Sequence, residues 1–374
     1  MSIFVTGATG YLGGYVLNEL LNRCEDRLSV LVRAKDADAA RSKLWMTLQL
    51  HMDGEQFWAS QSRIDFVYGD LHAPELGIDQ VTRKRLLKET DSVLHIAASL
   101  NRKSDKACLN TNLRGTLSVI KLARAIADQS GLRRYSHVST TAVAGQRHAE
   151  TVFEDTSIDW DRSDYDPYAR TKKFCEHMAV ELLEDVEQTF FRPSIVMGDS
   201  RKPLTSQFDM VGAFCGLARM PLIPIDGNSR FDIVPADFVG EAIARLHLKA
   251  KPDHKRYHLS GGTASPTGFQ IDAALRPAGM RLRFAPRLSR PFHVVVRGLN
   301  RLPRGNKLQP VGAVMKVFWP YITFDTVFDN TRVTSELDLP APNFTTYGAE
   351  LFQYATGNGF KYPYVALPEK REAA

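Results

Sequence analysis

Alternation between short apolar runs and longer helix-like stretches is the feature that most constrains how this chain folds. The runs SIFVTG, LSVLVR, RIDFVYGD, SVLHIAAS, YSHVSTTAV and QTFFRPSIVMG are nearly continuous in apolar residues, and stretches such as YLGGYVLNELLNR, TLSVIKLARAIAD and KKFCEHMAVELLE separate them. Strands that are apolar on both faces are typical of a parallel sheet covered by helices on both sides. We therefore predict an α/β fold built on a doubly wound parallel sheet.

A glycine-rich loop follows the first of these strands and opens the first helix. Its sequence, FVTGATGYLGGYVL, has the spacing Gly-x-x-Gly-x-x-Gly. Without side chains, the backbone can turn tightly and bring its N–H groups and the positive end of the helix against a pyrophosphate. This position in an α/β chain indicates dinucleotide binding. We assign to the cofactor the loop residues Gly7, Thr9, Gly10, Tyr11, Leu12 and Gly13.

The regular alternation ends near residue 199, where prolines become frequent. We expect residues 1–199 to form a dinucleotide-binding Rossmann core, and residues 231–263 to return to it with one more helix and strand. Residues 200–230 and 264–374 would then build a smaller substrate cap. Such a cap would lie over the carboxyl ends of the strands, where sheets of this kind bind their ligands.

The second strand ends at Arg33, where an NAD-binding protein usually has an acidic residue that holds the adenosine ribose. A guanidinium suits a ribose that carries a 2′-phosphate, because it can make a bidentate charged contact. Lys43 is expected to add a second positive charge from the following helix. The sequence therefore predicts NADPH as the cofactor.

The ends of the third and fourth strands complete the expected cofactor site. Asp70 can accept a hydrogen bond from the adenine amino group, and Leu71 can pack on the ring. His95 is interpreted as a core histidine, and Asn112 as a structural bridge between backbone segments. Room for the cofactor at the end of the fourth strand is expected from the small residues Ala97, Ala98 and Ser99.

The stretch DPYARTK places Tyr168 and Lys172 four residues apart behind an Asp-Pro turn. Residues at this spacing lie on one face of a helix. Free tyrosine has a pKa of about 10, so a cation such as Lys172 is needed to favour the phenolate. The fifth strand ends in Ser139, Thr140 and Thr141, whose hydroxyls can face this helix across a bound cofactor. A Tyr-x-x-x-Lys pair also occurs by chance on solvated helix faces, so the pair gains weight only from the other segments.

Composition adds a regional charge and few other signals. The chain carries a net charge of +6, whereas residues 273–324 contain eight arginines, two lysines and no acidic residue. The rest of the chain is therefore net negative, which favours a local anionic partner and argues against nucleic-acid binding. With the apolar runs FHVVV and VMKVFWPYITF, the segment is interpreted as an apolar tunnel rimmed by cations. Two alternatives remain open: an amphipathic cap with solvated arginines, and peripheral contact with a membrane.

Neither a secretion signal nor an apolar run of roughly 18 residues, the length a membrane-spanning helix needs, occurs in the sequence. The cysteines are far apart, so we assign no metal site and no disulfide framework, and expect a cytoplasmic location. They are Cys24, Cys108, Cys175 and Cys215.

With these residues placed, the chain resembles the extended short-chain dehydrogenase/reductase superfamily over roughly residues 1–260. The segments GATGYLG, LVRAKD, VYGDLHAPELGI, HIAASLN, STTAV, YARTK and FDIVPADFV look most like the branch of thioester reductases and fatty acyl-CoA reductases. The resemblance implies that Thr140, Tyr168 and Lys172 are the catalytic hydroxyl, proton donor and lysine. It also implies that Pro193 and Ile195 line the nicotinamide.

This resemblance implies an NADP-dependent reductase that transfers hydride to an acyl thioester, on CoA or an acyl carrier protein, to give an aldehyde or alcohol. With such a substrate, residues 273–324 are expected to form an acyl tunnel whose cations meet CoA phosphates or an acidic carrier protein. An alternative shares every cofactor residue: a dehydrogenase, ketoreductase or epimerase acting on a ketone, hydroxysteroid or nucleotide sugar. A dinucleotide-sensing protein without activity would have no need of the hydroxyl, tyrosine and lysine together. Only the cap can discriminate between the two enzyme classes.

Overall fold

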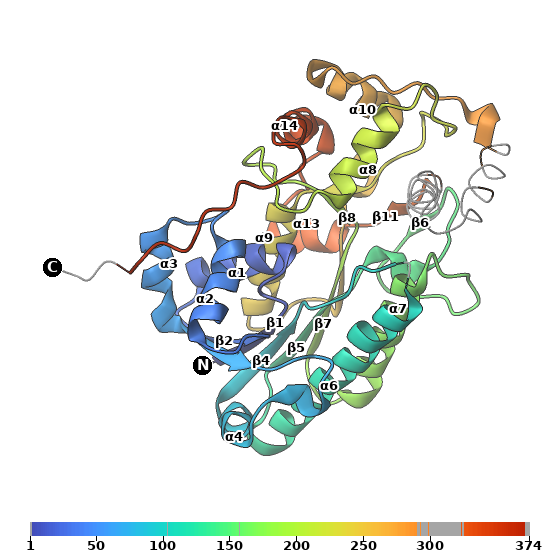
Figure 1. Ribbon diagram of the computed structural model, residues 1–374. Helices are drawn as coiled ribbons and strands as arrows, with labels where there is room; N and C mark the ends of the chain where they lie inside the picture. Colours follow the sequence, from blue (N-terminus) through green and yellow to red (C-terminus); the bar gives the residue numbers. More distant parts are fainter. Residues whose placement is uncertain are drawn as a thin grey trace.

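A seven-stranded parallel sheet forms the centre of the protein (Figure 1). The computed structural model describes residues 2–102, 104–156, 158–289, 292, 298, 323 and 325–370. The strand order is β10-β7-β5-β4-β1-β2-β3, and every pair is parallel, which confirms the predicted doubly wound sheet. The strands are β1 (Ser2–Thr6), β2 (Arg27–Val32), β3 (Ile64–Tyr68), β4 (Thr90–His95), β5 (Arg134–Val138), β7 (Gln188–Pro193) and β10 (Arg256–Leu259).

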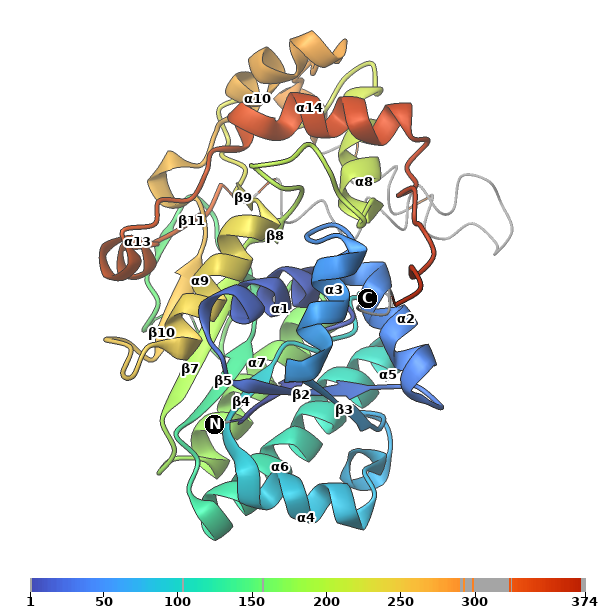
Figure 2. The same ribbon diagram turned by 90° about the vertical axis from the view of Figure 1, so that its left-hand side faces the viewer.

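Helices cover both faces of this sheet (Figures 1 and 2). Apolar side chains of α1, α2, α3, α9 and α13 join one buried cluster with β1 and β2, and those of α4, α6 and α7 join a second cluster on the opposite face. The first group comprises α1 (Tyr11–Arg23), α2 (Ala37–Leu48), α3 (Gly54–Ser60), α9 (Ala236–Leu248) and α13 (Thr331–Leu337). The second comprises α4 (Gln80–Glu89), α6 (Gly115–Ser130) and α7 (Pro167–Leu182), with the short α5 (Asp105–Cys108) beside it.

The start of α7 is set by its own sequence. The Asp166 side chain accepts a hydrogen bond from the Ala169 backbone N–H at 2.8 Å, and Pro167 occupies the first turn. An acidic cap satisfies a free N–H of the first turn, and the ring of proline already has the helical φ angle. These local preferences begin the helix at Pro167, one residue before Tyr168.

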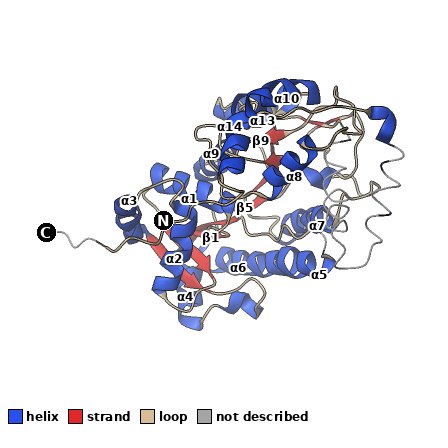
Figure 3. Ribbon diagram, turned by 45° about the horizontal axis from the view of Figure 1, so that its top comes forward, coloured by secondary structure: helices blue, strands red, loops and turns tan. Residues whose placement is uncertain are grey.

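A second layer lies beyond the carboxyl ends of the strands and has its own apolar cluster (Figure 3). It contains α8 (Asp209–Ala218), α10 (Gly268–Leu275) and α14 (Phe344–Gly357), whose residues Val211, Phe214, Ile271, Leu351 and Phe352 pack together. Two small parallel sheets stand between this layer and the main sheet: β8 (Ile195–Val196) with β9 (Ile233–Val234), and β6 (Thr151–Val152) with β11 (Val327–Phe328).

The division into core and cap predicted from the sequence stays a prediction in its details. Helix α13 lies in the range assigned to the cap, yet Val333 and Leu337 pack in the cluster of the Rossmann core. The predicted acyl tunnel lies mostly outside the described residues, because both apolar runs that were to form it fall almost wholly there. Within the described part of the chain, no helix is long and apolar enough to cross a membrane.

Candidate active site

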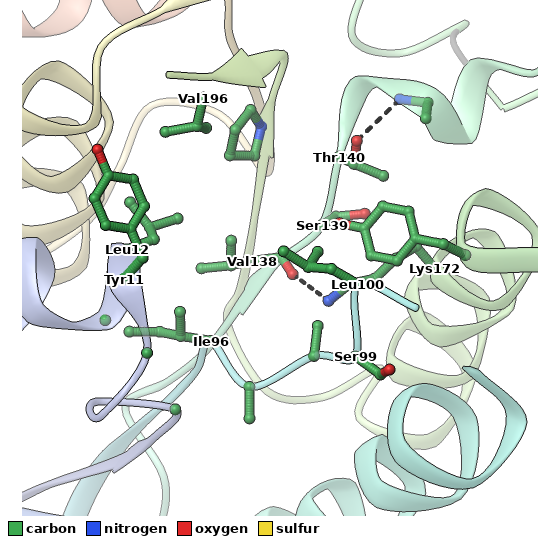
Figure 4. A pocket seen from close by; sticks show the side chains of 18 of the residues that line it. Tyr11, Leu12, Ile96, Ser99, Leu100, Val138, Ser139, Thr140, Lys172 and Val196 are labelled. Atoms are coloured by element: carbon green, nitrogen blue, oxygen red, sulfur yellow. Dashed lines mark hydrogen bonds between the residues drawn. The ribbon is translucent and has the colours of Figure 1, made fainter. Parts of the chain in front are cut away.

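A cavity of about 660 Å³ opens at the carboxyl edge of the sheet and collects nearly all the residues predicted for the site (Figure 4). The glycine loop lies at one end of it, and Tyr168 and Lys172 of α7 lie in its wall. Lys43 is the predicted site residue that does not line it. Those that do are Gly7, Thr9, Gly10, Tyr11, Leu12, Gly13, Arg33, Asp70, Leu71, Ala97, Ala98, Ser99, Thr140, Tyr168, Lys172, Pro193 and Ile195.

The glycine loop packs so closely that side chains are excluded at two of its positions. Gly7 has φ +81°, and a Cβ there would lie 2.5 Å from the backbone nitrogen of Ala97. A Cβ on Gly13 would lie 2.0 Å from the carbonyl oxygen of Gly7. Glycine at these positions leaves the N-terminus of α1 open toward the cavity, where a phosphate can meet backbone N–H groups.

Two cations stand beside this loop at the end of β2. Arg33 is mostly exposed, with its Nη1 atom 3.9 Å from Oδ2 of Asp70, and the Lys43 ammonium donates to the Arg33 carbonyl oxygen. Lys43 lines an adjoining cavity of about 740 Å³, to which Arg33 also contributes. The Asp70 carboxylate already accepts a hydrogen bond from the His72 backbone N–H at 2.9 Å.

Two residues interpreted as structural have clear structural contacts. The His95 ring is fully buried between the hydroxyls of Thr6 and Thr116, at 2.6 and 2.9 Å, and burial lowers its pKa to about 3. The Asn112 side chain accepts from the Ser99 backbone N–H at 2.7 Å and donates to the Thr171 hydroxyl at 3.1 Å. It thereby joins the loop after β4 to helix α7.

Tyr168 is buried in the cavity wall, and its surroundings supply a cation that was not predicted. Burial raises the pKa of the phenol to about 12, against the charge of Arg102 and a hydrogen bond with Thr140, which lower it. The Arg102 guanidinium lies 4.7 Å from the ring centroid and pairs with Asp166 at 3.1 Å. The sequence had suggested Lys172 as the cation that lowers this pKa, whereas Arg102 is the cation with the clear effect in the structure. Its sequence signal was its place three residues after Ser99, in a loop at the carboxyl edge.

Lys172 is almost completely buried at the floor of the cavity. Its ammonium donates to the Val138 carbonyl oxygen at 2.6 Å, as the dashed line in Figure 4 shows. Removal from water disfavours the charged form, so the pKa falls from its ordinary value to about 8. The lysine is therefore near the point of losing its proton in mildly alkaline solution.

The hydroxyls after β5 separate into different environments. Thr140 accepts from the Ala142 backbone N–H at 3.2 Å and also interacts with Tyr168. The Ser139 Oγ atom is buried and has no hydrogen-bond partner among the described residues. The contact with Tyr168 favours Thr140 as the catalytic hydroxyl, and that assignment stays a prediction.

The far side of the cavity contains polar residues that sequence reasoning did not assign. Asp232 is buried there, its Oδ1 atom accepts from the Gly261 backbone N–H at 2.8 Å, and burial raises its pKa to about 6. The sequence predicts that the RFDIVPADFV segment, which carries Asp232, returns to the core with a helix and a strand, and it indicates no role for this segment in the site. Further unassigned lining residues are Arg102, Tyr165, Ser194, Gln207, Asp209, Met210, Arg230, Asp325, Thr326 and Phe328.

Comparison with known proteins identifies the family of this chain. A family profile described as male sterility protein matches residues 5–243, which is more than half of the chain. A nonribosomal peptide synthetase of Aspergillus flavus is 30% identical over 271 residues, and a putative fatty acyl-CoA reductase of Drosophila melanogaster is 26% identical over 314 residues. These matches cover 69% and 72% of this chain but only 26% and 61% of the relatives, so the chain spans part of their length.

Solved structures show the same fold. The terminal R domain of the myxalamid biosynthetic pathway superposes with a TM-score of 0.80 at 24% identity, covering 96% of this chain and 91% of that domain. A UDP-glucuronic acid 4-epimerase of Bacillus cereus superposes with a TM-score of 0.62 at 17% identity, covering 97% and 99% of the two chains. The fold is thus shared between a terminal R domain and a sugar-nucleotide epimerase, so the fold alone does not distinguish between functions.

Proposed function

This chain belongs to the male sterility protein family of extended short-chain dehydrogenases/reductases, and we propose that it is an NADPH-dependent reductase of acyl thioesters. The observation that carries the proposal is the convergence of Thr140, Tyr168 and Lys172 on the cavity whose other end is the glycine loop. One cavity can therefore hold a dinucleotide along the carboxyl edge of the sheet and present a substrate carbonyl to a phenol.

The cofactor is a nicotinamide dinucleotide, and the residues of this chain suit it. Gly7 and Gly13 leave space where any Cβ would collide with backbone, which is the requirement for a pyrophosphate at the N-terminus of α1. Arg33 and Lys43 favour the 2′-phosphorylated form, because both residues line the cavity beside the glycine loop. When bound, NADPH supplies the hydride that reduces the carbonyl carbon.

The protein residues then control the substrate oxygen. Tyr168 keeps its proton at neutral pH, since its pKa is about 12, and gives that proton to the oxygen as negative charge develops there. The Thr140 hydroxyl would donate a hydrogen bond to the same oxygen, and Lys172 would hold the nicotinamide ribose hydroxyls. With a thioester, addition of hydride and proton gives a hemithioacetal, which releases a thiol and leaves an aldehyde. A second reduction would give the alcohol.

We propose that the acyl group arrives on CoA or on a carrier protein. Support comes from two relatives: the Drosophila melanogaster protein is described as a putative fatty acyl-CoA reductase, and the Aspergillus flavus protein as a nonribosomal peptide synthetase. Of the arginines in the acid-free segment that the structure describes, Arg276 pairs with Asp272 at 2.9 Å. The others, Arg281, Arg283 and Arg287, are exposed and can meet a phosphate or an acidic surface. We also propose a cytoplasmic location, which is supported by the four free cysteines.

Turnover of a thioester substrate tests this proposal directly. NADPH oxidation is followed by absorbance with panels of acyl-CoA, aldehyde, ketosteroid and sugar nucleotide. We expect oxidation with acyl-CoA, and a loss of about 10²–10⁴-fold in kcat for Tyr168→Phe, because general acid catalysis is removed.

Tyr135→Phe is the matched control, since Tyr135 is a tyrosine buried in the core and outside the cavity. It should leave turnover nearly unchanged. Oxidation of NADPH that is equally fast in the Tyr168→Phe variant would refute the chemistry, and turnover confined to sugar nucleotides would replace thioester reduction with the alternative function.

A further inference from the structure

The cavity of about 740 Å³ beside the glycine loop has one wall that comes from the end of the chain. Its inner wall contains Thr9 and Arg33 of the core and Lys43 of α2, and its outer wall contains Phe360 and Tyr364. We call residues 360–368 the C-terminal strap. Figures 1 and 2 show that this segment leaves α14 in the cap and runs past α3 and α2 of the core.

The strap is held on the core by bonds to its backbone. The indole N–H groups of Trp45 and Trp58 donate to the carbonyl oxygens of Val365 and Pro368, at 3.0 and 2.9 Å. The Val365 backbone N–H donates to the Gln49 side chain at 2.9 Å. Hydrogen bonds to backbone atoms fix the course of the strap and leave its side chains available for other contacts.

Pro368 also packs where α3 has no side chain. A Cβ on Gly54 would lie 2.3 Å from the Pro368 ring, so glycine at this position is what lets the strap approach α3. Together, the two indoles, Gln49 and Gly54 seat the strap on α2 and α3, the helices beside the end of β2.

The cavity under the strap has the character of an anion site with an aromatic wall. Arg33 and Lys43 bring two positive charges to it against the one negative charge of Asp209, and Arg33 lines both this cavity and the cofactor cavity. The Tyr364 ring is 45% exposed even though it packs edge-on against Tyr362 at 4.8 Å, so much of its surface is open to a ligand. A phosphate near two cations and a planar base on an aromatic ring are complementary to such a wall.

We propose that the C-terminal strap is part of the cofactor site: it walls the pocket for the 2′-phosphorylated adenosine end, with Tyr364 in contact with this end. This inference rests on the proposed use of NADPH. The cap therefore contributes to cofactor choice as well as to the substrate side.

Binding of 2′,5′-ADP, which contains only this end of the cofactor, tests the inference without any turnover. Isothermal titration calorimetry compares 2′,5′-ADP with 5′-AMP on the full chain. We expect 2′,5′-ADP to bind wild type more tightly than 5′-AMP, and Tyr364→Ala to weaken 2′,5′-ADP by about tenfold, the effect of losing one aromatic contact. Tyr364→Phe keeps the ring and should retain most of the affinity.

Val365→Ala is the matched control in the same strap. Its side chain is 58% exposed and does not line the cavity, and the substitution keeps both backbone bonds. It should bind 2′,5′-ADP within about twofold of wild type. Circular dichroism shows whether Tyr364→Ala folds. If it does not, Gln49→Ala is used instead: this substitution loosens the strap from α2 and must weaken the binding of 2′,5′-ADP.

Equal affinity of wild type and Tyr364→Ala for 2′,5′-ADP would overturn the inference and reduce the strap to a tie between cap and core. No binding of 2′,5′-ADP to wild type would overturn it together with the proposed NADPH preference. A weakened Tyr364→Ala variant in a protein that turns over no thioester would keep the inference and remove only the proposed reaction.

Discussion

Burial determines the protonation of the two groups of α7 that face the cavity. The Tyr168 phenol and the Lys172 ammonium are both removed from water, and each moves toward its neutral form: the pKa of Tyr168 rises to about 12 and that of Lys172 falls to about 8. A neutral phenol is the form that can donate a proton, whereas the lysine must stay charged to act as a cation. Both residues therefore act in their protonated forms, and Lys172 is the first of the two to lose its proton as pH rises.

The pH dependence of cofactor use should report Lys172. Its charged form exists below its pKa, so the charge is present at pH 7 and is lost as pH rises through about 8. We expect kcat/KM for NADPH to fall above pH ~8, because this ratio reports the free enzyme. The Lys172→Arg variant keeps its positive charge, so its kcat/KM, although reduced, should stay constant to above pH ~9. An identical alkaline limb in both proteins would exclude Lys172 as its origin.

Gly7 and Gly131 form a matched pair for measuring the close approach of the glycine loop. Both have positive φ, +81° and +82°, but a Cβ on Gly131 would meet nothing within 4 Å. Gly131→Ala should therefore cost only the strain of this glycine-favouring backbone conformation, about 1–3 kcal/mol. Gly7→Ala adds the collision with Ala97 and should cost about 1–3 kcal/mol more, with loss of cofactor binding. Urea denaturation measures both, and equal costs would show that the loop is not tightly packed.

Helix α7 is held on the sheet by a buried ion pair. Arg192 at the end of β7 donates to both carboxylate oxygens of Glu176, at 2.9 and 2.6 Å, and to the Glu154 carbonyl oxygen at 2.7 Å. Both side chains of the pair are about 1% exposed. Glu176 lies one turn after Lys172, so this pair fixes the helix that presents the lysine and tyrosine to the cavity.

Removing one charge of this pair should destabilise the protein strongly. Glu176→Gln leaves the buried guanidinium without its counter-charge and is expected to cost about 3–5 kcal/mol of unfolding free energy, measured by denaturant titration. Asp185→Asn breaks the surface pair with Arg124 and serves as the control, with little expected change. A Glu176→Gln variant as stable as the control would mean that the pair does not anchor α7.

Across the whole molecule, the chain returns from the cap to the core twice after residue 325. Helix α13 packs in the core cluster, and the C-terminal strap is bonded to α2 and α3. The cap also contacts the chain just after β8, since a Cβ on Gly198 would lie 2.5 Å from Leu351 of α14. Core and cap are thus linked at several points around the proposed cofactor site.

A ligand that binds only the folded protein raises its stability, so the cofactor preference should be visible in thermal unfolding. At about 100 times its Kd, NADPH should add about 2.7 kcal/mol and raise the melting temperature, whereas NADH at the same concentration should raise it less. Arg33→Ala should reduce the NADPH shift to that of NADH, because the 2′-phosphate loses its guanidinium. Equal shifts for both cofactors in wild type would contradict the NADPH preference.

The sequence by itself determined the parallel sheet, the glycine loop and the pairing of Tyr168 with Lys172. These features depend on local patterns: continuous apolar runs, glycines at a strand-helix junction, and a four-residue spacing on one helix. Family membership followed from the same segments, and the profile that matches residues 5–243 confirms it. The sequence also predicted correctly that His95, which lies in an apolar strand, is buried in the core.

Only the tertiary structure brought Arg102 to the Tyr168 ring, Asp232 to the wall of the cavity, and Tyr364 to the cations beside the glycine loop. Each of these residues lies in a loop or terminal segment, where no periodic pattern indicates which way a side chain points. Their partners are distant in sequence, as Trp45 is from Val365, and the contact arises from packing of the cap on the core. Local patterns determine elements, whereas contacts between distant segments depend on how the elements assemble.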